Sequence, residues 1–225
     1  MRLRFLRPVN GWSGFLTELA IVVLGVLIAL GAQQAADAWR WRGEVRQFRA
    51  VVDNEIGFNL GAYADRLKQS DCINRRLDQL DRWHKGLSAG ARLTLTSRIG
   101  RPTTTTLRTS VWHSRTPDVT AHLELETRLS YAAFYDDFGG YQVIGDRERQ
   151  LWGELLDFEG AASLDRRDLL RLRGLIERGR LASRLIEGNW PSLSARATAF
   201  GILPWEPTDL PASETVCEPL TWTVN

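Results

Sequence analysis

The longest uninterrupted run of apolar positions lies near the amino terminus. No polar side chain occurs from Leu19 to Ala32, and the apolar character extends from Phe15 to Ala35. At ~1.5 Å per residue the extended stretch rises roughly 31 Å, which matches the hydrocarbon core of a bilayer. Trp12 precedes it and Trp39 and Trp41 follow it, where interfacial aromatic belts occur. We therefore predict a transmembrane helix over residues 15–36 that contacts the lipid bilayer.

A cleaved signal peptide is the alternative interpretation of the same stretch. Ala29-Leu30-Gly31 and Ala36-Asp37-Ala38 both have the small residues of a cleavage site. However, the helical pattern continues through both sites, and Glu18 interrupts the front of the apolar region. We therefore expect a retained anchor.

One face of the predicted helix combines small residues with a single acid. Positions spaced 7, 4, 3 and 4 apart share a helix face, and here they hold Glu18, Gly25, Ala29, Ala32 and Ala36. A small pair four residues apart lets another helix backbone approach closely. An acid in the membrane normally faces a partner or water; the alternative is that Glu18 snorkels and that small residues are simply common in membrane helices. We interpret this face as a helix-packing face for other membrane subunits or for self-association.

The charges that flank the span bear on topology. Arginines lie on both sides, at positions 2, 4 and 7 and at positions 40, 42, 46 and 49, so the positive-inside rule is nearly balanced. A short basic start before one apolar helix usually behaves as a signal anchor. We expect residues 1–14 in the cytoplasm, the helix in the bacterial inner membrane, and the main domain in the periplasm.

Apolar residues keep the helical period beyond the membrane. The spacing of Val45, Phe48, Val52, Ile56 and Leu60 predicts that the anchor continues as a stalk helix. The pattern continues, or restarts after Ser70-Asp71, and ends near Gly90. The overall prediction is an all-α fold, with residues 37–200 as a helical domain.

The remaining boundaries follow from glycine, proline and threonine. Residues 91–106 predict a surface loop, with "RLTLT" as a short strand in the alternative, and a short helix lies around 107–113. Further helices are expected from Pro117 to Gly139-Gly140, over 143–159, over 163–188 up to Gly188-Asn189 and Pro191, and over 192–200. Residues 201–225 are proline-rich and irregular, but their tryptophans and aliphatic residues predict that they pack on the bundle.

Composition narrows the class of protein. The 225 residues are 44% hydrophobic and 25% charged, which is typical of one folded domain with an appendage. A net charge of +2 and arginines that alternate with acids, as in "LDRRDLLRLRGLIERGR", indicate solvated helix faces. We therefore predict no nucleic-acid partner.

Two cysteines, Cys72 and Cys217, lie far apart without a CxxC or zinc spacing. They are either two buried thiols in the cytosol or one disulfide in an oxidising compartment. The periplasmic topology favours the disulfide.

Candidate catalytic chemistry is sparse. His122, Glu124 and Glu126 alternate, which in a helix points them apart, so a surface or capping histidine is favoured over a metal site with His113. His84 falls on an apolar stripe, and Asp136-Asp137 beside Tyr135 is explained as helix-end charge. The aromatic cluster "YAAFYDDFGGYQ" is explained as core, with a protein-binding patch as the alternative. We predict no catalytic residue, metal or cofactor, and the histidine-free membrane helix offers no haem ligand.

The anchor resembles the start of an uncharacterised family of bacterial single-pass membrane proteins. The matching residues are Glu18, then Gly25-Val26-Leu27-Ile28-Ala29-Leu30, then Gly31-Ala32-Gln33-Gln34, and Trp39. The match spans residues 12–48. It implies an anchored protein and brings no activity or catalytic residue.

The expected function is that of a non-catalytic accessory or assembly subunit of a larger inner-membrane complex, respiratory or photosynthetic among the candidates. A periplasmic sensor that signals through a partner, and a periplasmic enzyme with an unrecognised site, are the alternatives.

Overall fold

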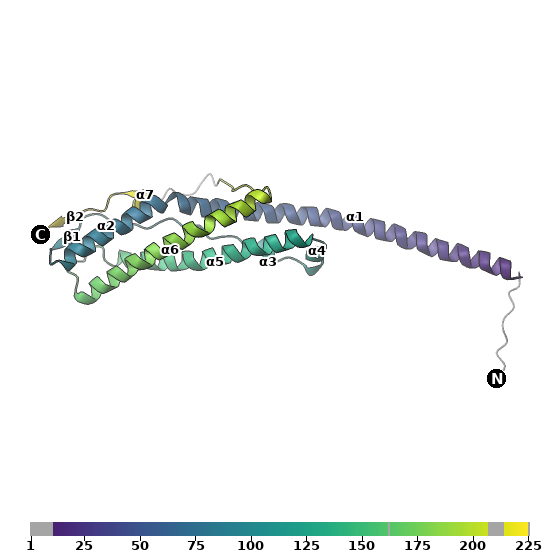
Figure 1. The fold of residues 1–225 in the computed structure, drawn as a ribbon, viewed down its shortest axis with the longest axis horizontal. Coiled ribbons are helices and arrows are strands. Elements are labelled where there is room, and N and C mark those ends of the chain that lie inside the picture. The colour runs from purple at the N-terminus through teal and green to yellow at the C-terminus, as the bar shows by residue number, and fades with distance from the viewer. Residues whose placement is uncertain (1–10, 162, 207–213, 225) are drawn as a thin grey trace, which may run out of the picture. The chain divides into compact units, whose positions relative to one another are not determined.

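The fold is known from a computed structural model that describes residues 11–161, 163–206 and 214–224. The structure is mostly helical (Figure 1), as predicted. The helices are α1 (Gly11–Lys68), α2 (Ser70–Ser88), α3 (Ser110–His113), α4 (Pro117–Ala121), α5 (Leu125–Leu156), α6 (Arg166–Ala199) and α7 (Glu214–Cys217), and the strands are β1 (Leu93–Leu95) and β2 (Trp222–Val224). Two compact units form: residues 1–49 with 116–123, and residues 50–115 with 124–225.

The first unit contains the amino-terminal part of α1 and the short helix α4. α4 begins as predicted, with Pro117 at its first turn and the Thr116 hydroxyl accepting from the backbone N–H of Val119. It ends at Ala121, so the predicted continuation to Gly139-Gly140 is wrong, and a new helix starts at Leu125.

The second unit is a helical bundle in which α6 packs against both α2 and α5 (Figure 1). The apolar stripe predicted for α1 is confirmed, since Val52, Ile56 and Leu60 are fully buried. α1 ends at Lys68 and α2 begins at Ser70, so of the two alternatives the restart is right, although it begins at Ser70 and not after Asp71. The main core cluster joins α2, α5 and α6 and includes Leu77, Trp83, Trp152, Leu155 and Ile176.

Two predicted helix ends are wrong because tertiary packing outweighs local propensity. α5 passes through Gly139-Gly140, where Phe138 and Tyr141 are buried on either side. A glycine inside a helix costs only about 1 kcal/mol, which is less than the burial of one aromatic ring contributes. α6 likewise passes through Gly188-Asn189 and carries Pro191 inside it.

The segment that follows β1 runs along α1 and α2. Side chains of these helices, and that of Gln69 between them, hydrogen-bond to its backbone. The Asn59 amide bonds both the carbonyl (2.6 Å) and the N–H (2.8 Å) of Arg108. The Gln69 amide does the same for Thr103, at 3.0 and 2.9 Å. Each amide thereby makes the pair of hydrogen bonds that a neighbouring strand would make.

The distance between Asn59 and Gln69 matches the distance between the two backbone positions that they bond. Asn59 and Gln69 are separated by roughly 15 Å at ~1.5 Å per helical residue, and Thr103 and Arg108 by roughly 16 Å at ~3.3 Å per extended residue. Farther along, the buried guanidinium of Arg76 donates to the carbonyls of Arg98 (2.8 Å), Ile99 and Glu218. We call residues 96–109 the strap.

Part of the described carboxyl-terminal segment packs on the bundle, although Leu203 and Trp205 are 81% and 53% exposed; residues 207–213 and 225 lie outside the described residues. Ile202, Val216 and Leu220 are buried, and β2 pairs antiparallel with β1, with Thr94 opposite Thr223. Of the two interpretations of "RLTLT", the strand is therefore right for Leu93–Leu95, while the strap is a loop. Cys72 and Cys217 form the predicted disulfide, with Cα atoms 4.7 Å apart.

A close backbone contact fixes the start of this segment on α1. A Cβ added at Gly57 would lie 2.9 Å from the carbonyl oxygen of Leu203, and one at Gly61 would lie still closer to that of Trp205. The Trp205 N–H donates to the Gly57 carbonyl at 2.8 Å. Only glycine at both positions permits this approach.

We therefore predict that Gly61→Ala displaces the segment and lowers the free energy of unfolding by about 1–3 kcal/mol. Gly140→Ala is the matched control, because it is also helical but its added Cβ meets nothing within 4 Å; it should stabilise by roughly 0.5–1 kcal/mol. Denaturant unfolding measures stability, and hydrogen exchange at the Trp205 amide reports the contact. Unchanged protection of that amide in Gly61→Ala would contradict the assignment.

Candidate functional site

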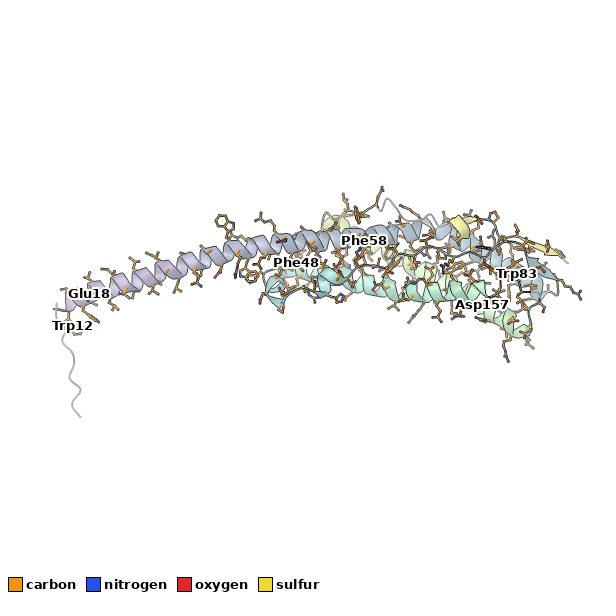
Figure 2. The ribbon with its side chains drawn as sticks, turned by 180° about the vertical axis from the view of Figure 1, so that it is seen from behind. Trp12, Glu18, Phe48, Phe58, Trp83 and Asp157 are labelled. Carbon is orange, nitrogen blue, oxygen red and sulfur yellow. A yellow bond between two sulfur atoms is a disulfide. The ribbon has the colours of Figure 1, made fainter. Side chains whose placement is uncertain are left out.

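The apolar segment of α1 is long enough and apolar enough to cross a membrane, and it is the one such helix among the described residues. None of its most apolar window is buried. In Figure 2 its side chains, Trp12 and Glu18 among them, extend outward from the helix. The helix is continuous through this region, so periodicity places Glu18, Gly25, Ala29, Ala32 and Ala36 on one face, as the sequence predicts.

This face is open. Each of the five residues is exposed, and a Cβ built at Gly25 meets nothing within 4 Å. Another helix can therefore approach at Gly25 and Ala29 until the backbones nearly touch.

The tryptophans after the span differ from one another. Trp39 is 76% exposed, as an interfacial residue would be. Trp41 is half-buried because the His122 ring stacks on it, with centroids 4.1 Å apart and planes 11° apart. The Nδ1 of His122 lies 2.8 Å from the carbonyl of Asp118. His122 thus holds α4 to α1 and does not combine with Glu124 and Glu126 in a metal site.

The second unit buries an ion pair between α1 and α5. Arg66 donates through Nε to one oxygen of Glu148 at 2.8 Å and through a terminal nitrogen to the other at 2.5 Å. Both side chains are only 1% exposed. Tyr63 and Tyr141 pack on each other beside this pair, with centroids 4.2 Å apart. A bidentate geometry of this kind is the form in which a buried pair offsets its desolvation.

A second buried acid, Glu55, joins α1 to α3 and α5. One of its oxygens accepts from the Tyr135 hydroxyl at 2.5 Å. The other accepts from the Ser110 hydroxyl at 3.2 Å and the Val111 N–H at 3.1 Å. Glu55 therefore satisfies the first turn of α3, whose own preceding residue, Thr109, makes no capping bond.

Asp136 and Asp137 lie inside α5, which continues to Leu156, so their explanation as helix-end charge is wrong. The Tyr135 hydroxyl is engaged by Glu55, and Asp137 pairs with Arg196 at 2.5 Å. Asp136 is exposed. The aromatic rings of the YAAFYDDFGGYQ stretch are buried or nearly so, which confirms their interpretation as core: Tyr131, Phe134, Tyr135, Phe138 and Tyr141.

The sequence interpretation missed the buried polar residues. Asn59 and Arg66 continue the spacing of the buried positions Ile56 and Tyr63 on α1, so a polar residue on an apolar stripe is the signal that marks them. Among the described residues, no group of three or more His, Cys, Asp or Glu side chains could hold a metal ion.

Breaking the Arg66–Glu148 pair should be costly, because it leaves a charge buried without its partner. We predict that Arg66→Met lowers the free energy of unfolding by about 3–5 kcal/mol and that Arg66→Met with Glu148→Leu recovers most of the loss. Lys85→Met is the control; Lys85 pairs with Asp81 at 2.7 Å but is 71% exposed, so its loss should cost less than about 1 kcal/mol. A double variant no more stable than Arg66→Met would refute this account.

Three of the four tyrosines make the fold sensitive to alkali. Burial raises the pKa of Tyr63 to about 12, and burial also raises the pKa values of Tyr135 and Tyr141. Because each raised pKa belongs to the folded state, the stability linked to it is complete below the ordinary tyrosine pKa of ~10 and is lost as pH rises toward and past 12. Phenolate absorbance and circular dichroism should therefore change together above pH ~10. Phenolate formation by these tyrosines near pH 10 in a protein that keeps its helical signal would contradict this.

No protein-family description, curated protein or solved structure matches this chain. The resemblance of residues 12–48 to a family of single-pass membrane proteins therefore stays a prediction. Two features of the protein itself bear on its function: an open face on an apolar helix, and a domain whose buried charges hold its own elements together.

Proposed function

We propose that this protein is a non-catalytic, single-pass membrane protein that serves as an accessory or assembly subunit of a larger inner-membrane complex. The observation that carries the proposal is the open small-residue face of the apolar helix. A helix that only tethers a domain has no need of a face at Gly25 and Ala29 that admits another backbone.

The disulfide supports a periplasmic location for the second unit. A Cys72–Cys217 bridge persists in an oxidising compartment and is rare in the cytosol. With the domain outside, residues 1–14 lie in the cytoplasm.

The use of the buried charges supports a binding role. Glu55 satisfies the start of α3, and Arg66 and Glu148 neutralise each other across α1 and α5. Arg76 holds strap carbonyls. These buried charged groups hold the fold together. We therefore assign the activity of the protein to its surfaces and to contacts with other integral membrane subunits.

Association through the helix can be tested with one residue. Gly25→Leu keeps the segment apolar, so the variant should insert normally, but its side chain blocks close approach. We predict that it loses at least tenfold of the partner protein that co-purifies with wild type in mild detergent, measured by quantitative mass spectrometry.

Leu24→Ala is the matched control on another face of the same helix and should keep the partner. Glu18→Gln tests the acid separately: loss of the partner would show that the charge contributes. Equal co-purification by Gly25→Leu and wild type would overturn the proposal that this face binds.

A further inference from the structure

A shallow groove lies on the first unit where the apolar segment of α1 ends. Its volume is about 490 Å³, and it is lined by Gln34, Asp37, Ala38, Trp41, Arg42, Val45 and His122. The stacked rings of Trp41 and His122 give it an aromatic surface. Unlike the small-residue face, it combines aromatic, cationic and anionic groups.

The two charges lie on opposite sides of this groove. At 100° per residue, Gln34, Ala38, Trp41 and Val45 share a narrow face of the helix, while Asp37 and Arg42 fall on its two edges. A ligand that lies across the groove therefore meets a carboxylate at one end and a guanidinium at the other.

Both charged groups are available. Among the described residues, the exposed Arg42 side chain forms no ion pair or hydrogen bond. Asp37 faces Arg40 at 3.6 Å, with both side chains more than half exposed, and such a surface pair contributes little stability. Arg40 is itself shared with Glu44 and lies over the Trp41 ring.

The position of the groove points to lipid, on the basis of the proposed span over residues 15–36. Trp41 is roughly 7 Å beyond residue 36 at ~1.5 Å per residue. The headgroup layer on each side of a bilayer is about 5–8 Å thick. The groove therefore begins within the span at Gln34 and crosses the headgroup layer.

We propose that this groove binds the headgroup of a phospholipid that carries both a phosphate and a primary ammonium group. Arg42 binds the phosphate, for which a guanidinium fork is suited. Asp37 accepts hydrogen bonds from the ammonium group, and the acyl chains follow the apolar surface below Gln34. A headgroup with only negative charge brings no ammonium group to Asp37, and a trimethylammonium headgroup has no N–H to donate to it.

Native mass spectrometry of the full-length protein tests this assignment. Delipidated protein in detergent is given an equimolar mixture of phosphatidylethanolamine, phosphatidylcholine and phosphatidylglycerol with identical acyl chains. Wild type should retain phosphatidylethanolamine at least fivefold over either of the others. Arg42→Gln should lose this preference, and Asp37→Asn should shift it toward phosphatidylglycerol.

Arg92→Gln is the matched control, because Arg92 is an exposed arginine of the second unit; it should leave retention unchanged. Equal retention of the three lipids by wild type, or an unchanged preference in both groove variants, would overturn the proposal. Displacement of the lipid by millimolar free phosphoethanolamine would assign the groove to a soluble ligand instead.

Two further measurements separate this proposal from the proposed function. Gly25→Leu should lose the partner protein yet keep the lipid preference, and Arg42→Gln should do the reverse. If wild type leaves the membrane without detergent, the span and both proposals fail together. If it requires detergent but shows no lipid preference, the lipid site alone fails.

Discussion

The second unit depends on one requirement: an extended backbone segment without neighbouring strands must still find partners for its N–H and C=O groups. Asn59 of α1, Arg76 of α2 and Gln69 between the two helices meet this requirement in part, because their side chains bond the backbone of the strap directly. Buried polar groups without partners are expensive, so these bonds fix where the strap lies along α1 and α2.

Much of the fold could be predicted from the sequence, and the features that were wrong or missed share one cause: they depend on residues far apart in the chain. The helical period located the stripe from Val52 to Leu60, because it follows from local spacing. The restart at Ser70 was one of two alternatives that the pattern left open. The ends predicted at Gly139-Gly140 and Gly188 were wrong because local propensity is worth about 1 kcal/mol and long-range packing decides. The Arg66–Glu148 pair was missed because its partners are 82 residues apart, and a single sequence records no such pairing.

For the candidate binding surfaces, the features that depend on local spacing could be predicted, and the contact that depends on distant residues could not. The apolar segment and the exposed stripe of small residues along it could be predicted from sequence, because membrane thickness and helix geometry fix what such a segment needs; the interfacial role of the tryptophans stays a prediction. The stack of His122 on Trp41 was not, because it joins a short helix to α1 across eighty residues of chain. Charged residues also differ between the two units. The buried charges of the second unit are paired or bonded to backbone. In the first unit, Arg42 at the end of the apolar segment forms no ion pair or hydrogen bond with the described residues.

The disulfide can form only after both of its cysteines have been synthesised. Cys72 must wait for a partner 145 residues later in the chain, which at roughly 5–20 residues per second takes on the order of ten seconds. The chain has two cysteines, so during that interval Cys72 has no wrong partner within its own molecule. In that interval Cys72 can pair wrongly only with thiols of other molecules in the same compartment. Formation of the bridge therefore needs an oxidant and time, and no isomerase has to correct it within one chain.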